Sequence, residues 1–155
     1  MANTNGSIFA NKQLGLGIDD KNAMVFASLR QFVWTQGEPL PLIYDLEHEI
    51  YAKKGIIPAT LSNLEAVGLI SVEQAGYVKK GFGQHTRLFY FGKPTKIKFP
   101  KEGNNQLDLG HILFTDKGKA LVTTIQPERD QEFYEYVIDQ WFHHGLITSS
   151  VLPKW

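Results

Sequence analysis

The chain has no cysteine among its 155 residues. Disulfide bridges, thiol nucleophiles and cysteine-ligated zinc are therefore excluded, and a reducing compartment is the natural expectation. Long apolar runs are absent as well: no stretch approaches the about 18 apolar residues that a membrane span requires. The N-terminus also lacks a basic segment followed by an apolar core. These absences predict a cytoplasmic protein with no membrane partner.

Net charge is also absent, because 16 basic residues balance 16 acidic ones. A general electrostatic attraction to nucleic acid or to anionic membranes is therefore missing, and any such attraction must come from the segregation of charge. Apolar residues make up 43% of the sequence and aromatic residues 12%. These values are typical of a globular chain that buries a proper core.

Signatures of catalysis are missing too. Glu47-His48-Glu49 is not the H-E-x-x-H zinc pair, and the adjacent His143 and His144 point to different sides of a helix. Gly81-x-Gly83 lacks the third glycine of a dinucleotide loop, and neither a phosphate-binding loop nor a nucleophile elbow occurs. Unless residues distant in the sequence assemble a site, we expect no enzyme activity, no metal and no cofactor.

One stretch, residues 54–99, carries most of the information. Its first part predicts a helix over Pro58–Leu69, because Pro58 suits the first helical position and Gly68 can adopt the left-handed conformation that ends a helix. The opposite face carries small side chains, so the helix can approach a flat partner closely. The buried stripe recurs every three residues, at Leu61, Leu64 and Val67.

The exposed face of this helix is a candidate for contact with duplex DNA. Asn63 can hydrogen-bond an adenine edge, and Thr60 and Ser62 can reach phosphate or base. The alternative is a plain solvated surface, since the helix contains Glu65 and neither lysine nor arginine.

Positive charge is concentrated in residues 76–101, which include no acidic residue. Alternation over Thr95–Phe99 predicts a half-buried strand with Lys96 and Lys98 together on one face. Gly81-Phe82-Gly83 is typical of a hairpin tip, where glycine supplies positive φ angles. The sequence therefore predicts a basic β-hairpin here. Its seven basic residues are Lys79, Lys80, Arg87, Lys93, Lys96, Lys98 and Lys101.

Two uses of this hairpin remain open. A DNA-binding wing needs basic side chains that hold phosphates, whereas a sheet edge uses lysines only to prevent aggregation. The residues expected to contact phosphate are Lys79, Lys80, His85, Arg87, Lys96 and Lys98. Aromatic residues interleave with the basic ones, which permits either base stacking on single strands or ordinary strand packing. They are Tyr77, Phe82, Phe89, Tyr90 and Phe91.

The flanking pattern places the hairpin in a larger arrangement. One helix is expected from Asp19 or Asp20 to Gln36, and a second over Ile43–Lys53, ahead of the Pro58 helix. Three helices followed by a hairpin are the plan of a winged helix-turn-helix. The expected class is therefore α+β, with three helices, an antiparallel β-hairpin or small sheet, and additional C-terminal helices.

The last third of the chain predicts a strand over Leu107–Phe114, a helix capped by Thr115, and a final helix over Glu128–His144. We expect a flexible segment over residues 1–18 and a winged-helix domain over residues 19–126. A C-terminal helix and tail over residues 127–155 are expected to pack on the same domain.

Two motifs resemble the winged-helix superfamily: N-L-E-A-V-G-L-I at Asn63–Ile70 and L-F-T-D-K-G-K-A-L at Leu113–Leu121. With the preceding Phe32-Val33-Trp34, they are similar to the C-terminal region of an uncharacterised bacterial family known only as a domain of unknown function. The resemblance covers about residues 20–147 and implies a fold, with almost no activity attached. Members of that family are longer at the N-terminus, so this chain is either a stand-alone relative or an excised domain.

These patterns support two functional hypotheses. The first is a winged-helix domain that binds nucleic acid, namely duplex DNA, in regulation. The second is a protein-interaction or self-association module, in which the basic hairpin contacts an acidic protein partner or the acidic last helix of another copy. Zero net charge and the quiet helix face favour the second hypothesis, and the acid-free hairpin favours the first.

Overall fold

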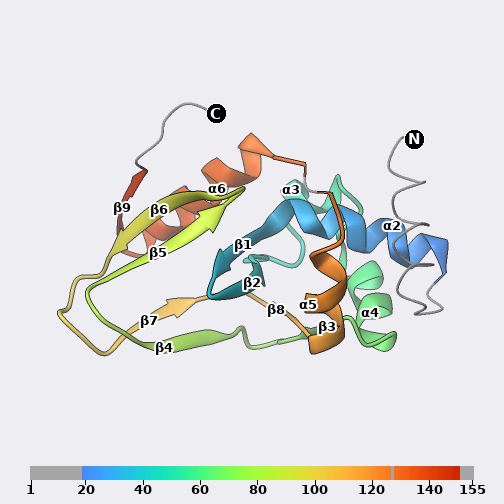
Figure 1. Ribbon diagram of the computed structural model, residues 1–155, viewed down its shortest axis with the longest axis horizontal. Coiled ribbons are helices and arrows are strands. Elements are labelled where there is room, and N and C mark those ends of the chain that lie inside the picture. Colours follow the sequence, from blue (N-terminus) through green and yellow to red (C-terminus); the bar gives the residue numbers. More distant parts are fainter. Residues whose placement is uncertain (1–18, 127, 151–155) are drawn as a thin grey trace.

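The computed structural model describes residues 19–126 and 128–150 of the chain. These residues form a mixed α/β structure with a five-stranded antiparallel sheet and two small two-stranded sheets (Figure 1). In chain order the elements are α2 (Asp20–Leu29), the 3-10 helix η1 (Arg30–Phe32), β1 (Val33–Gln36), β2 (Glu38–Pro41), α3 (Glu49–Ala52), α4 (Pro58–Ala66), β3 (Ile70–Val72), β4 (Val78–Phe82), β5 (His85–Tyr90), β6 (Lys93–Lys98), β7 (Asn105–Asp108), β8 (Ile112–Phe114), α5 (Asp116–Val122), α6 (Gln131–His143) and β9 (Ile147–Ser150). The flexible segment expected over residues 1–18 lies outside the described residues.

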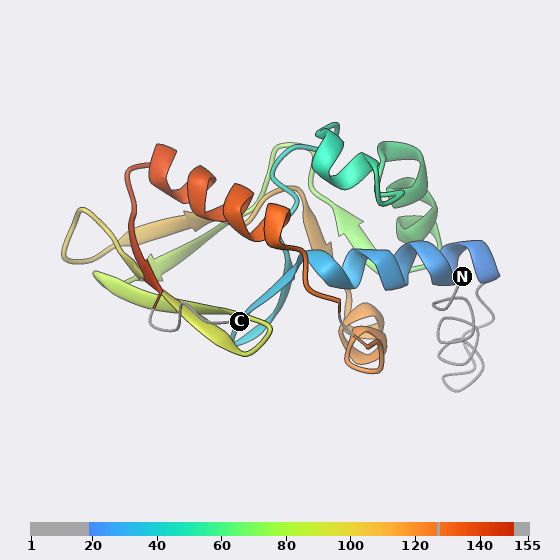
Figure 2. The ribbon, with the colours of Figure 1, turned by 90° about the horizontal axis from the view of Figure 1, so that it is seen from above.

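The largest sheet has the strand order β2-β1-β5-β6-β9. Alternate side chains of its central strands are buried, among them Leu88, Tyr90 and Ile97. Helix α6 covers this inner face, as the view from above shows (Figure 2). Trp34 of β1 stacks on Tyr90 with ring centroids 5.1 Å apart and meets Trp141 of α6 edge-on at 5.0 Å. Aromatic packing of this kind fixes α6 to the sheet.

Strands β3 to β8 form one long antiparallel ribbon in three paired segments. Its cross-strand partners include Ile70 with Phe114, Val78 with Asp108, and His85 with Lys98. The tip is the two-residue turn Phe91-Gly92, whose φ angles are 53° and 74°. Positive φ at both central residues is the hallmark of the type I′ turn, whose twist matches that of paired strands. The end of the ribbon folds back, and β5 pairs with β1 while β6 pairs with β9.

The winged helix-turn-helix prediction is wrong. The expected tip at residues 81–83 does not exist, because β4 pairs with β7 and β5 pairs with β6. The basic strands are the centre of the five-stranded sheet and do not project as a hairpin wing beside three helices. Burial explains the difference: the apolar side chains that alternate along β5 and β6 need a helix against them, and α6 provides it.

Two predicted helices are also too long. The first ends at Leu29, after which Val33–Gln36 form β1, since Val, Trp and Thr favour a pleated surface over a helix. The second covers only Glu49–Ala52 of the expected Ile43–Lys53. The strand predicted over residues 107–114 breaks into β7 and β8 near Gly110, where a φ of 82° turns the chain.

Several terminal signals are confirmed. Helix α4 begins at Pro58 and ends at Ala66, and Gly68, which follows the C-cap residue Val67, adopts a φ of 81°. Thr115 caps α5, because its hydroxyl accepts from the Gly118 N–H at 3.0 Å and donates to the Gly68 carbonyl at 2.6 Å. The last helix, α6, lies within its expected range and is followed by Gly145 at a φ of 82°. Caps that end or begin a helix locally are thus readable from the sequence.

Candidate nucleic-acid interface

The outer face of the five-stranded sheet gathers four of the predicted site residues. Along β5, the inward-pointing Leu88 and Tyr90 alternate with outward-pointing residues, and β6 alternates in the same way. Arg87 lies directly opposite Lys96, and His85 lies opposite Lys98. We call the exposed set His85, Arg87, Lys96 and Lys98 the basic face.

The charge of the basic face is not balanced by neighbouring strands. Strand β9, the next neighbour, places Ser149 beside Lys96 and Ile147 beside Lys98. Elsewhere in the described part of the chain, lysines do form ion pairs, with Glu132 and Glu38 as partners. Within residues 19–126 and 128–150, the structure shows no ion pair to Arg87, Lys96 or Lys98. Like charges directly opposite each other destabilise a sheet, so this arrangement costs stability that an anionic ligand would recover.

Arg87→Glu tests that cost. The substitution turns the cross-strand pair with Lys96 into one of opposite charges, so we expect the free energy of unfolding to rise by roughly 0.5 to 1 kcal/mol. Urea unfolding followed by circular dichroism measures the change, with Arg87→Gln as the uncharged control that should lie between. A free energy of unfolding that falls on both substitutions would show that Arg87 stabilises the sheet and that the repulsion is unimportant.

An exposed aromatic ring lies on the sheet next to the basic face. Phe89 keeps 37% of its surface exposed, between Thr35 of β1 and Pro94 of β6. Phe89 is two residues from Arg87 and points the same way, so an aromatic ring and a guanidinium group share one surface. The sequence alone leaves open whether this ring stacks on bases or packs in the sheet. The signal that separates it from its neighbours is the alternation in T-R-L-F-Y, which buries Tyr90 and exposes Phe89.

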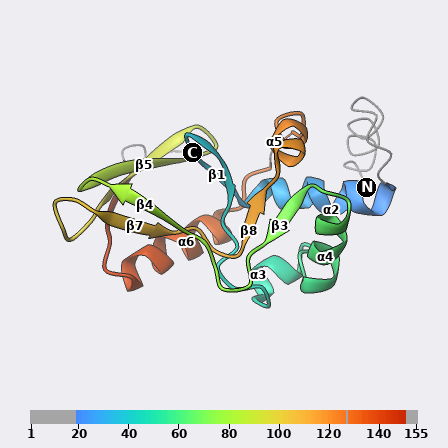
Figure 3. The ribbon, with the colours of Figure 1, turned by 90° about the horizontal axis from the view of Figure 1, so that it is seen from below.

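The three candidates on α4 are not part of this surface. Helix α4 and the β5-β6 pair lie toward opposite ends of the molecule, both in Figure 1 and in the view from below (Figure 3). Ser62 and Asn63 are exposed there. The hydroxyl of Thr60 accepts from the Ile57 N–H at 3.1 Å and donates to the Gly55 carbonyl at 2.6 Å. Thr60 therefore caps its own helix.

Thr60→Val is expected to lower the free energy of unfolding by about 1 kcal/mol, because the helix start loses its side-chain cap. It should leave the affinity for any oligonucleotide unchanged. Thermal unfolding and an oligonucleotide titration of the same preparation measure both quantities. If the affinity falls while the free energy of unfolding stays unchanged, Thr60 contacts the oligonucleotide, contrary to this account.

The two candidates on β4 point to opposite sides of the ribbon. Lys79 donates to the Gln36 side chain at 2.7 Å, and its ammonium group lies 5.8 Å from the centre of the Phe82 ring. Lys80 is exposed and pairs in register with Gln106 of β7. Lys79 thus ties the ribbon to β1, and neither lysine continues the rows of the basic face.

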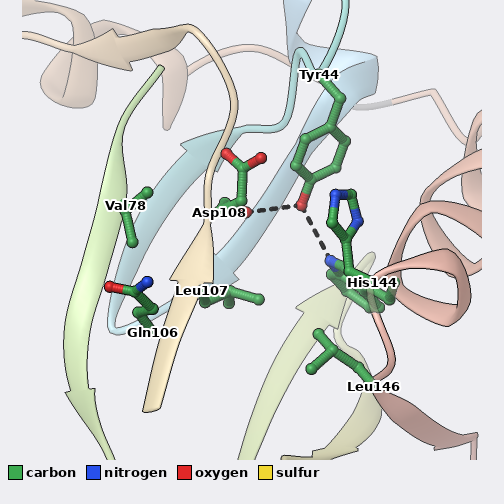
Figure 4. Close-up of a pocket in the computed structure, with 8 residues that line it drawn as sticks. Tyr44, Val78, Gln106, Leu107, Asp108, His144 and Leu146 are labelled. Carbon is green, nitrogen blue, oxygen red and sulfur yellow. Dashed lines mark hydrogen bonds between the residues drawn. The ribbon is translucent and has the colours of Figure 1, made fainter. Parts of the chain in front are cut away.

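A cavity of about 210 Å³ separates the β4-β7 segment from the end of α6 (Figure 4). At its edge the Tyr44 hydroxyl donates to the Asp108 carbonyl at 3.0 Å and accepts from Trp141 Nε1 at 3.0 Å. Burial raises the pKa of Tyr44 well above its usual value. The cavity is smaller than roughly 300 Å³, the lower end of the range for ligand pockets. The Tyr44 hydroxyl links β7 to α6 through its two hydrogen bonds. Its other lining residues are Val78, Gln106, Leu107, His144 and Leu146.

A more open groove carries His48 and His111 near Asp45 and Glu47. His48 Nδ1 accepts from the Ile50 N–H at 3.0 Å and so caps α3. His111 Nδ1 lies 2.9 Å from the Glu73 carbonyl and donates to it. In the described part of the chain, no three His, Asp or Glu side chains are grouped so that they could hold a metal ion. Both imidazoles therefore have structural partners.

A search of protein families, curated proteins and solved structures finds no match to this chain. The resemblance to a bacterial family of unknown function stays a prediction. Within residues 19–126 and 128–150, no helix combines the length and apolar character needed to cross a membrane.

Proposed function

We propose that this protein binds single-stranded nucleic acid on the outer face of its five-stranded sheet. The observation that carries the proposal is the pairing of Arg87 with Lys96 and of His85 with Lys98, with no acidic partner among the described residues. Phosphate contacts supply most of the affinity of nucleic-acid-binding proteins, and a surface that concentrates uncompensated positive charge in a neutral chain is suited to them.

The rows of side chains suggest how a strand lies on the sheet. Phe89 and Arg87 are two residues apart on one strand, a spacing of about 7 Å. Bases that stack on Phe89 would therefore place their phosphates over the row of Arg87 and Lys96. Exposed aromatic rings beside basic residues are the usual platform for unpaired bases, because every base has a face that stacks.

Single strands are favoured over the duplex expected from the sequence. A duplex hides the faces of its bases, so Phe89 would have nothing to stack on. Recognition of bases in a major groove requires a helix or a β-ribbon inserted into it. Helix α4, which carries the candidate base contacts, contains no basic residue and lies far from the basic face. Regulation by such binding, and a cytoplasmic location, stay predictions.

Phe89→Ala tests the mode of binding. Removal of one stacking ring is expected to weaken binding to a single-stranded oligonucleotide by about 1 to 3 kcal/mol, which is roughly 5-fold to 150-fold. The slope of log affinity against log salt should stay unchanged, because no phosphate contact is lost.

Fluorescence anisotropy at several salt concentrations measures both quantities. Tyr77→Ala is the matched control, since Tyr77 is a similarly exposed aromatic residue outside the basic face. Equal losses for Phe89→Ala and Tyr77→Ala would contradict a stacking site on the sheet. If the basic face instead serves an acidic protein partner, the wild-type chain should show no binding to the oligonucleotide.

A further inference from the structure

The side of the molecule opposite the basic face is acidic. Helix α6 packs on the inner face of the sheet, so its exposed side points away from the basic face (Figure 2). Residues spaced by three and four positions share one side of a helix. The exposed side of α6 carries Gln131, Glu132, Glu135, Asp139, Phe142 and His143. We call Glu132, Glu135, Asp139 and Phe142 the acidic stripe.

The acidic stripe keeps most of its charge. Glu132 forms an ion pair with Lys53, but Glu135 only accepts a hydrogen bond from Gln131 at 2.8 Å. Asp139 lies 3.4 Å from His143, which carries a positive charge only when protonated. Helix α6 itself contains no lysine or arginine. Phe142 ends the stripe with 71% of its surface exposed.

The two surfaces match in charge, apolar content and size. Each surface carries exposed apolar side chains among its charged ones. On the sheet these are Phe89 and Ile147, which is 65% exposed, and on the stripe it is Phe142. A helix of this length spans about 20 Å, and five strands span about 24 Å. We propose that α6 of one copy docks on the outer sheet face of a second copy of this chain.

The geometry determines the kind of assembly. Because the two surfaces lie on opposite sides of one molecule, two copies cannot satisfy both at once, and the contact is head-to-tail. Such contacts extend into open chains whose length grows with protein concentration and shrinks with salt. Docking of α6 also covers the basic face, so an oligonucleotide competes with it. The inference goes beyond the proposed function and does not require it.

Sedimentation velocity of two complementary variants tests the contact. The first variant neutralises the stripe through Glu135→Gln, Asp139→Asn and Phe142→Ser, and the second neutralises the sheet through Arg87→Gln and Lys96→Gln. At low salt, wild type should exceed the 17.5 kDa mass of one chain and return to it at high salt. Each variant alone should stay a single chain. An equimolar mixture of the two should form one-to-one complexes of twice that mass and nothing larger, because each retains one intact surface.

Two results would overturn the inference: wild type that stays a single chain at low salt, or a mixture that forms no complex. Asp20→Asn with Asp116→Asn is the charge-matched control and should associate like wild type. The stripe variant also separates this inference from the proposed function, since its basic face is intact. If the stripe variant binds an oligonucleotide but wild type does not self-associate, only the docking proposal fails. If wild type self-associates but no variant binds an oligonucleotide, only the proposed function fails.

Discussion

Arg87→Glu combined with Lys96→Glu is expected to lower the affinity for a single-stranded oligonucleotide by roughly a hundredfold at low salt, since two phosphate contacts are lost and two repulsions are added. The two positions face each other across β5 and β6, so the double substitution replaces one like-charged pair with another. Stability should therefore change little, and a loss of affinity cannot be blamed on unfolding. Fluorescence anisotropy with circular dichroism measures both properties.

The salt dependence sharpens this prediction. Each lost phosphate contact should reduce the slope of log affinity against log salt by about 0.7 for a single strand, so the double variant should lose about 1.4. Lys117→Glu, on the exposed side of α5, changes the charge of the chain without touching the sheet. If this control weakens binding as much as the double variant does, the attraction is diffuse and the basic face is not a site.

Gly118→Ala is expected to lower the free energy of unfolding by about 3 kcal/mol, although alanine favours helices over glycine by about 1 kcal/mol. A Cβ at Gly118 would overlap the Leu69 carbonyl oxygen and lie 3.2 Å from Cδ1 of Phe114. Relief of that overlap requires α5 to move away from the start of β3. The movement would break the hydrogen bond from Thr115 to the Gly68 carbonyl.

Urea unfolding measures the effect of Gly118→Ala. Lys117→Ala, one position earlier on an exposed part of the same helix, is the control and should change stability by less than about 0.5 kcal/mol. A Gly118→Ala protein as stable as wild type would show that α5 does not pack against the Leu69 backbone. The contact between α5 and β3 would then need revision.

The start and stop signals of α4 and the start of α5 could be predicted because their causes are local. Pro58 and Gly68 delimit α4, and the Thr115 hydroxyl begins α5, each through the backbone chemistry of a few neighbouring residues. The charge of the basic face could also be predicted, since alternation along β6 separates Lys96 and Lys98 from Ile97. Both kinds of inference need only residues close in the sequence.

The fold-back of the ribbon could not be predicted, because its causes are distant. The true tip contains Phe91 in a left-handed conformation, whereas Gly81-Phe82-Gly83 has the composition of a turn and lies within and just after a strand. Pairing of β5 with β1 brings together Phe89 and Thr35, which are far apart in the chain. The same long-range pairing places the basic residues away from α4 and exposes Phe89 beside Arg87. The candidate site therefore differs from the expected one in its position, although His85, Arg87, Lys96 and Lys98 belong to both.

Binding of single-stranded nucleic acid to the sheet is best tested with the wild-type chain and a fluorescent oligonucleotide of about 15 nucleotides, a length within the footprint of known single-strand sites. The same sequence annealed to its complement serves as the duplex. We predict that the single strand binds more tightly than the duplex, with log affinity falling linearly as log salt rises from low to physiological concentration. No binding of the single strand at low salt, or tighter binding of the duplex, would contradict the proposed function.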